Sequence, residues 1–209
     1  MAPLSIQTYV VGPVQTNCYF AINDDTKEVL IIDPGASAKQ LAEKVKEQGL
    51  KPVAILLTHG HFDHATGAGE LAQLLHIKIY AQEKEKETLE NPQLNLSGWQ
   101  GSELVFYADE YLKDEQEIDL AGFHIRVFLT PGHTVGSQSV LIDTGTEEGT
   151  YAIIGDLSNL KKGYEEGYLP AYYYSLGDCY ESRERVEKEH AKIICVHDPE
   201  TYTHAFFGK

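Results

Sequence analysis

The chain has 209 residues and a formal net charge of −15, from 17 Lys and Arg against 32 Asp and Glu. A surface this acidic repels phosphate backbones and anionic headgroups, so we expect neither a nucleic-acid nor a membrane partner. Hydrophobic residues make up 42% of the chain and charged residues 23%, which is ordinary globular usage and excludes global disorder. Domains average ~150 residues, so a single domain over residues 1–209 is expected.

No segment of the sequence indicates export or membrane insertion. No apolar run approaches the ~18 residues of a transmembrane helix, and the first residues lack the basic and apolar regions of a secretory signal. The cysteines, Cys18, Cys179 and Cys195, are odd in number and widely spaced, which argues against a C-x-x-C zinc site and a disulfide framework. These features predict a cytoplasmic protein with reduced thiols.

The first part of the chain alternates strands with helices. Apolar runs between turn residues predict strands over 5–11, 17–22, 28–33, 53–57 and 77–80. Ser37 and Gln40 have the spacing of a capping box, which predicts a helix that ends near Gly49. Further helices are expected over 67–75 and 83–89, and an irregular surface segment over 91–102. The charged run 83–87 indicates a solvated helix face.

The second part is again rich in strands. Strands are expected over 123–129, 137–143, 150–154 and 192–196, with a late helix over 175–190. Strands followed by helices, with no low-complexity linker between the two parts, suit two sheets packed face to face with helices outside. The expected fold is therefore a mixed α/β (α+β) sandwich in one compact unit.

The most informative motif is Thr58-His59-Gly60-His61-Phe62-Asp63-His64, directly after a predicted buried strand. Imidazole and carboxylate groups are common ligands of divalent metals. Side chains alternate in direction along an extended loop, so His59 and His61 would point one way, and Asp63 and His64 would serve a neighbouring position. A polar loop with incidental histidines is the alternative.

Three further strands each end in a residue that can bind a metal. His133 follows the strand 123–129 in a Thr-Pro-Gly turn, Asp156 ends the strand near 154, and His197 follows the strand near 196. A single histidine at a strand end is more often structural than functional. Four strand ends that deliver such residues to one edge of a fold instead indicate a rigid metal site.

This ordered set, His59-x-His61-x-Asp63-His64 followed by His133, Asp156 and His197, resembles the ligand set of the metallo-β-lactamase superfamily. The resemblance extends from Tyr9 to Asp198. It implies a four-layer αββα sandwich with a two-metal site at one edge. It also implies that the first metal is held by His59, His61 and His133, the second by Asp63, His64 and His197, and that Asp156 bridges both.

Two cations suit this number of ligands better than one. Seven protein ligands are too many for one tetrahedral ion, whereas two ions ~3.5–4 Å apart can share a carboxylate. A water between the ions would lose a proton near neutral pH and attack a carbonyl as hydroxide. Asp63 is the candidate for carrying the proton to the leaving group, unless it is only a ligand. Zinc is the expected metal, and iron or manganese also suits His and Asp ligands.

Two subfamilies of hydrolases share further motifs with this chain. Four runs are similar to hydroxyacylglutathione hydrolases (glyoxalase II), which are thioesterases: 15–19, 31–35, 58–64 and 130–137. The C-terminal part, through His197-Asp198-Pro199, is similar to N-acyl-homoserine lactonases. Those lactonases carry a tyrosine three residues after the bridging aspartate, where this chain has Asn159 and, nearby, Tyr164. The resemblance therefore implies hydrolysis of a thioester or a lactone.

A tyrosine-rich segment between Tyr164 and Tyr180 follows the last part of this motif set. Tyrosine offers a large contact area and a hydroxyl donor, which makes the segment a candidate wall of a substrate pocket. The substrate-binding candidates are Asn159, Tyr164 and Tyr173. Segment 91–111 could form the opposite wall. Core packing or a homodimer interface is the alternative for the tyrosine-rich segment.

Two other functions stay open at this stage. A di-iron redox module of the flavodiiron type has a similar fold, although its second motif position is a glutamate where this chain has His61. A non-catalytic metal-binding protein of the same fold would lack one or more ligands, and none is missing here. For the hydrolase, the expected partner is a small-molecule substrate.

Overall fold

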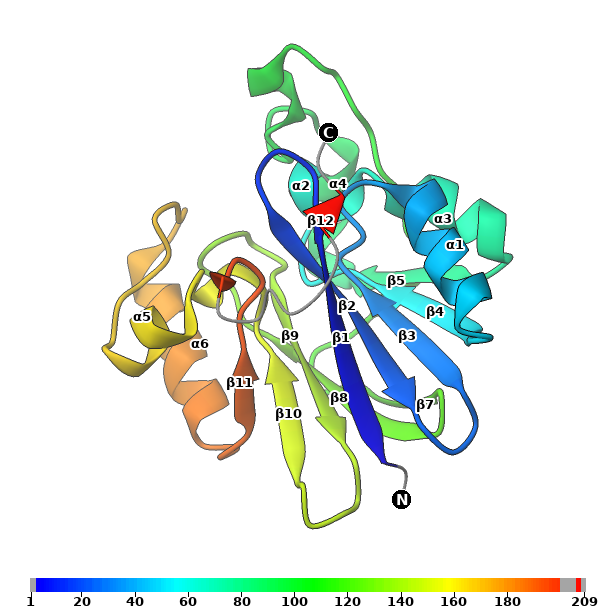
Figure 1. The fold of residues 1–209 in the computed structure, drawn as a ribbon. Helices are drawn as coiled ribbons and strands as arrows, with labels where there is room; N and C mark the ends of the chain where they lie inside the picture. Colours follow the sequence, from blue (N-terminus) through cyan, green and yellow to red (C-terminus); the bar gives the residue numbers. More distant parts are fainter. Residues whose placement is uncertain (1–2, 200–205, 208–209) are drawn as a thin grey trace.

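The strands of the protein form two sheets in the computed structural model, which describes residues 3–199 and 206–207 (Figure 1). The first sheet contains β1 (Leu4–Val11), β2 (Thr16–Asn23), β3 (Glu28–Ile32), β4 (Lys51–Leu56), β5 (Lys78–Gln82), β6 (Glu110–Leu112) and β12 (Phe206–Phe207). The second contains β7 (Glu117–Leu120), β8 (Phe123–Leu129), β9 (Gln138–Asp143), β10 (Thr150–Ile153) and β11 (Lys192–Ile194). The strand orders are β12-β1-β2-β3-β4-β5-β6 and β11-β10-β9-β8-β7.

Alternating side chains give the first sheet two buried faces. In β3, Val29 and Ile31 belong to one hydrophobic cluster, whereas Leu30 and Ile32 belong to another. Successive side chains of a strand point to opposite faces, so a strand that is apolar throughout needs a covering layer on both sides. The second cluster also contains Ile125 of the second sheet, so it fills the space between the two sheets.

Helices supply the two outer layers (Figure 1). The outer face of the first sheet is covered by α1 (Ala38–Glu47) and α3 (Ala68–Leu75), which share its hydrophobic cluster. The outer face of the second sheet is covered by α5 (Lys161–Glu165) and α6 (Leu176–Glu187), whose Tyr164 and Val186 pack in a third cluster. The layers are therefore helix, sheet, sheet and helix, which confirms the expected αββα sandwich.

The strand directions bring several carboxyl ends to one edge of the sandwich. Because β8 and β10 are both antiparallel to β9, they run parallel to each other, and β11 is parallel to β10. The first sheet meets this edge through backbone hydrogen bonds: Gln138 N donates to Thr58 O at 2.8 Å, and Asn17 N donates to Val196 O at 2.7 Å. The loops that follow β4, β8, β10 and β11 are thereby neighbours.

Most of the predicted strands and helices are confirmed, with local differences. The short elements β6, β7 and α5 were not expected, nor was α2 (Phe62–Ala65), which forms inside the His-rich loop. Two 3-10 helices were also not expected: η2 (Ser97–Gln100) and η3 (Gly155–Leu157). A third, η1 (Glu83–Glu85), forms the start of the helix predicted over 83–89. Ser37 is the N-cap residue of α1, but its φ is 60° and its side chain makes no capping hydrogen bond, so the capping box is wrong.

The charged run 83–87 differs from a plain solvated face. Glu83 and Glu87 are exposed, as predicted, and α4 (Lys86–Glu90) continues directly from η1. Glu85, however, is only 1% exposed. The prediction is therefore wrong for Glu85. The alternating charges of this run do not distinguish Glu85, whose side chain points toward the loops at the sandwich edge, from its exposed neighbours.

The cysteines and the helix lengths agree with the expectations from composition. The three cysteines, Cys18, Cys179 and Cys195, are buried free thiols. Among the residues that the structure describes, no helix is long and apolar enough to cross a membrane.

Candidate metal centre

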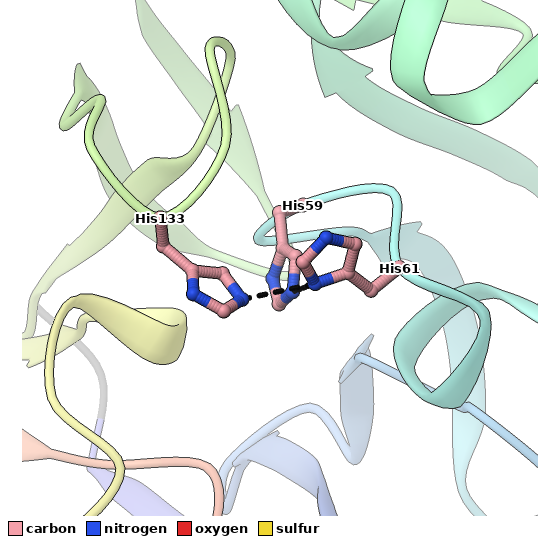
Figure 2. Close-up of side chains that lie close together, drawn as sticks. All are labelled: His59, His61 and His133. Carbon is pink, nitrogen blue, oxygen red and sulfur yellow. Dashed lines mark hydrogen bonds between the residues drawn. The ribbon is translucent and has the colours of Figure 1, made fainter. Parts of the chain in front are cut away.

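Three histidines from both sheets meet at the sandwich edge. His59 and His61 follow β4, and His133 follows β8; we call them the first group. His61 Nδ1 lies 3.0 Å from His59 Nε2 and 2.9 Å from His133 Nε2. Figure 2 shows the three rings directed into a common space. Nitrogen ligands of a tetrahedral zinc ion are about 3.4 Å apart at Zn–N bonds of ~2.0–2.1 Å, so these nitrogens are close to ligand spacing.

A second group of ligand-type residues lies beside the first. It consists of Asp63, His64 and His197, whose ligand atoms lie within 4.8 Å of one another. Asp63 Oδ2 is 3.3 Å from His64 Nε2 and 3.5 Å from His197 Nε2. Asp63 and His64 lie on α2, which begins at Phe62 directly after His61. The turn into α2 separates these two side chains from the first group.

Asp156 lies between the two groups. Its Oδ2 is 3.4 Å from His133 Nε2 of the first group. Its Oδ1 faces the second group, 3.6 Å from His64 Nε2 and 3.4 Å from His197 Nε2. One oxygen of the carboxylate thus faces each group, which is the arrangement that a bridging ligand requires.

Hydrogen bonds orient the rings from behind. His64 Nδ1 lies 2.9 Å from Asp33 Oδ2, and the same carboxylate accepts from Thr58 N and Thr58 Oγ1. His133 Nδ1 lies 2.7 Å from the carbonyl oxygen of Tyr172. Such partners fix the tautomer and leave the opposite ring nitrogen free to bind a metal.

Burial and charge set the protonation states of the first group. Burial, together with the neighbouring histidines, lowers the pKa of His61 to about 3 and lowers the pKa of His59 well below its usual range. Burial also lowers the pKa of His133, against the opposing effect of Asp156. The first group is therefore neutral at pH 7, which is the form of imidazole that binds metals.

Carboxylates in and around the second group favour the protonated form of His64. Burial opposes protonation of His64, but Asp63, Asp33 and Asp156 together raise its pKa well above the usual value. Burial would raise the pKa of Asp63, but His64 and His197 lower it to about 2. The carboxylates are therefore ionised at neutral pH. A bound cation would balance their negative charge in place of a protonated His64.

The residues fit a pair of divalent cations. Within the described part of the chain, His64 Nε2 and Asp156 Oδ1 are buried without a hydrogen-bond partner, and they face each other at 3.6 Å. An ion ligated by both, at ~2.0–2.2 Å from each, would satisfy both atoms at once. The donors are imidazole nitrogens and carboxylate oxygens, which suit zinc and also iron or manganese.

The substrate-binding candidates lie in different surroundings. Asn159 Nδ2 donates to Asp156 Oδ2 at 3.2 Å, so Asn159 adjoins the centre. Tyr164 is 6% exposed and packs in the third cluster, with the Arg183 guanidinium over its ring, so it does not line the centre. Tyr173 is exposed at the surface. The ring of Tyr172 instead lies 5.8 Å from that of His61 and 5.7 Å from that of His133.

Two residues near the centre had no role assigned from the sequence. Asp33 holds His64 and adopts φ 52°, a strained conformation for a non-glycine residue and a signal of a functional position. Thr16 Oγ1 donates to Asp63 Oδ2 at 2.8 Å. Both residues lie in runs that are similar to glyoxalase II, Asp33 in 31–35 and Thr16 in 15–19, and this similarity could have drawn attention to them.

Comparison with known proteins identifies the family. A sequence profile described as "Metallo-beta-lactamase superfamily" matches residues 11–197, a range that includes both groups and Asp156. The chain belongs to the metallo-beta-lactamase superfamily. The resemblance deduced from the ordered ligand motif is thereby confirmed.

Individual members of the metallo-beta-lactamase superfamily are similar over much of the chain. The probable metallo-hydrolase YqgX of Bacillus subtilis (strain 168) is 34% identical over 201 residues, covering 91% of this chain and 89% of the relative. The hydroxyacylglutathione hydrolase GloC of Haemophilus influenzae is 36% identical over 137 residues, covering 64% of each chain. The crystal structure of the BLEG-1 B3 metallo-beta-lactamase aligns with a TM-score of 0.71 at 32% identity, covering 86% of this chain and 84% of that one.

Membership of this superfamily supports a hydrolase. The relatives carry hydrolase names, and the His and Asp clusters are able to bind metal ions. The names of the relatives favour hydrolysis over the redox module of the flavodiiron type, whereas the metal-binding clusters suit both.

Proposed function

We propose that the protein is a dinuclear metal-dependent hydrolase that acts on an ester-type carbonyl, with a thioester as the first candidate. The first group would hold one cation, the second group the other, and Asp156 would bridge them. The observation that carries this proposal is the position of Asp156, one oxygen of which faces each group. A single domain over residues 1–209 belongs to the same proposal, and the hydrophobic cluster shared by the two sheets supports it.

Bound divalent cations would supply Lewis acidity for the carbonyl and would lower the pKa of water at the centre. The protein's own residues then have distinct tasks. Asp63 would carry a proton to the leaving group: its carboxylate is ionised at neutral pH, and Thr16 Oγ1 holds its orientation. Asn159 orients Asp156 through its amide. Tyr172 contributes one wall and limits the access of water.

A small cavity beside Asp63 gives an apolar part of the substrate a place to bind. Its volume is about 180 Å³, and Asp63 lies in its lining with Phe62, Gln100 and Leu104. Segment 97–104 was expected within the wall opposite the tyrosine-rich segment, and several of its residues line this cavity. We assign a short acyl group to it, because its lining is mainly apolar.

The contacts of Asn159 and Tyr164 favour a thioester over a lactone. The similar lactonases carry a tyrosine three residues after the bridging aspartate, whereas here Asn159 occupies that position and donates to Asp156. Tyr164, the nearest substitute in the sequence, packs in the third cluster. The similarity to the hydroxyacylglutathione hydrolase, whose substrate by name is a thioester, points in the same direction.

Metal analysis combined with substrate assays tests the proposal. We expect about two metal ions per chain and turnover of S-lactoylglutathione or a short acyl thioester, with zinc as the metal. His61→Ala should abolish turnover and lower the metal content, because His61 Nδ1 is the nitrogen shared by both close contacts of the first group. Faster turnover of acyl-homoserine lactones would favour the lactonase assignment. Bound iron with oxygen reduction and no ester hydrolysis would contradict the proposal.

A further inference from the structure

Glu85 is a buried carboxylate that the proposed reaction does not use. It ends η1 and precedes α4, and it is 1% exposed although Glu83 and Glu87 on either side are exposed. A buried carboxylate is costly unless hydrogen bonds compensate for the lost water. The hydrogen-bond partners of Glu85 therefore indicate the role of this buried side chain.

The two oxygens of Glu85 bind two different loops. Oε1 accepts a hydrogen bond from Gly60 N at 2.8 Å, and Oε2 accepts one from Gly136 N at 2.7 Å. Gly60 lies between His59 and His61, and Gly136 lies in the loop that carries His133. Each oxygen thus contacts one of the two loops that supply the first group.

The absence of side chains on both glycines allows this close approach. A Cβ on Gly136 would lie 2.2 Å from Glu85 N, and a Cβ on Gly60 would lie 3.1 Å from Leu89 atoms of α4. Thr88 and Thr134 also hydrogen-bond to the Glu85 side chain. The segment from η1 to α4 therefore packs directly against both loops, and the carboxylate lies between them.

The two loops have few other links. They belong to different sheets, since one follows β4 and the other follows β8. Gln138 connects the strand ends: its backbone N donates to Thr58 O, and its Nε2 donates to Leu57 O. These bonds lie before His59 in the chain, whereas Glu85 binds the amide between the two histidines.

We propose that Glu85 is a positioning residue that holds the His59–His61 loop and the His133 loop at the separation at which their imidazoles share one cation. The proposal rests on the proposed function for the identity of the first group as a cation site. Glu85 itself belongs to none of the groups of ligand-type residues, and its two oxygens accept hydrogen bonds from backbone amides. Loss of either bond would let the loops separate and would weaken the first group selectively.

The test compares Glu85→Gln with Glu87→Gln, an exposed residue of the same segment. Glutamine has the shape of glutamate, but its NH₂ cannot accept from the second amide. Both are made in an Asp63→Ala background, so that cation binding reports the first group. Zinc affinity is measured by competition with a chromophoric chelator, at a temperature where circular dichroism shows folded protein. We expect Glu85→Gln to weaken binding by about 10- to 100-fold, the usual effect of an outer-shell partner, and Glu87→Gln to leave it unchanged.

A second measurement needs no cation. The amide proton resonances of Gly60 and Gly136 in the metal-free protein should both move, and exchange faster with solvent, in Glu85→Gln. Glu85→Asp, which is one methylene shorter and cannot reach both amides, should behave in the same way if Glu85→Gln does not fold.

Three outcomes are separable. Folded Glu85→Gln that binds zinc as tightly as its parent would overturn the positioning role, even if its melting temperature fell. Unchanged amide resonances would overturn the contact itself. A wild-type protein that binds no zinc would instead contradict the proposed function, while the amide measurement would still decide whether Glu85 holds the loops.

Discussion

Tyr164 and Tyr172 belong to one tyrosine-rich segment but have different surroundings. Tyr164 is buried in the third cluster, and burial raises the pKa of its hydroxyl to about 12. In the described part of the chain that hydroxyl is buried without a hydrogen-bond partner. The ring of Tyr172 lies beside His61 and His133, and 45% of the residue is exposed. Of these two tyrosines, Tyr172 alone borders the candidate centre.

Paired substitutions separate these two environments. Tyr164→Phe should lower the free energy of unfolding by less than about 1 kcal/mol or even raise it, because an unpaired buried hydroxyl contributes little to stability. The same substitution should leave turnover unchanged. Tyr172→Ala should raise KM roughly 3- to 10-fold, the equivalent of ~0.5–1.5 kcal/mol of lost aromatic contact. Urea unfolding and steady-state kinetics measure the two effects. A loss of turnover in Tyr164→Phe would contradict the assignment.

The pKa of Glu85 adds a pH dependence to stability. Burial raises this pKa from 4.5 to about 7, against the opposing effect of its hydrogen bonds. Between these two values the folded protein keeps a proton that the unfolded chain has released. Its free energy of unfolding therefore falls as pH rises through that window, by on the order of 3 kcal/mol at most.

The comparison with Glu85→Gln tests this contribution, because the glutamine side chain does not titrate. In the metal-free state we expect the wild type to lose stability relative to Glu85→Gln as pH rises from about 4.5 to about 7. Urea unfolding of both proteins at a series of pH values gives the difference. A difference that stays constant with pH would show that Glu85 does not titrate in this range.

The start of α3 packs tightly against the turn that follows β3. A Cβ on Gly67, the N-cap residue of α3, would lie 2.4 Å from Pro34 O and 3.1 Å from backbone atoms of Ala36. That turn also carries Asp33, the carboxylate behind His64. The position of this helix is therefore coupled to the second group.

Two glycines of this region make a matched pair. Gly67→Ala should lower the free energy of unfolding by ~1–3 kcal/mol, because the methyl group has no room, and should weaken cation binding by displacing Asp33. Gly69→Ala should raise the free energy of unfolding by up to about 1 kcal/mol, because alanine is the better helix former. A Cβ on Gly69 would meet no atom within 4 Å. Denaturation curves and zinc titrations compare the two. Equal effects would contradict the packing argument.

The candidate centre joins the two sheets of the molecule. Its ligand-type residues follow β4, β8, β10 and β11, so they come together only in the folded chain. Ligands that bind the folded state alone stabilise it by mass action, by ~2.7 kcal/mol at a concentration 100 times Kd. A bound cation would therefore act as a cross-link between these strand ends.

Removal of metal should lower the melting temperature. At roughly 2–4 °C per kcal/mol for a chain of this size, chelation should lower it by about 5–10 °C, and zinc added back should restore it. Calorimetry in the presence and absence of a chelator measures the shift. An unchanged melting temperature, with metal loss verified by elemental analysis, would mean that the cations do not hold the strand ends together.

Local sequence patterns were enough for the strands and for the ligand motif. The uninterrupted apolar runs at β3 and β4 predicted buried strands, because alternation of side chains makes both faces apolar. The density of histidines around Gly60 predicted a site, because such residues rarely gather without a function. Neither argument needs to know what lies across the fold.

Other features depend on partners that are distant in the chain. Glu85 has the sequence context of a solvated helix face, and only its hydrogen bonds to Gly60 and Gly136 distinguish it from Glu83 and Glu87. The role of Asp33 likewise depends on His64, which lies one strand further along the sheet. The local sequence does not indicate such long-range hydrogen bonds.

The order and spacing of His, Asp and Gly residues by themselves determined the family and the set of ligand-type side chains, because ligand chemistry is a property of residue type. The tertiary structure decided the rest: which oxygen of Asp156 faces which group, which tyrosine meets the centre, and which of three similar glutamates is buried. Those outcomes depend on strand direction and on contacts between the two sheets, and these exist only once the chain has folded.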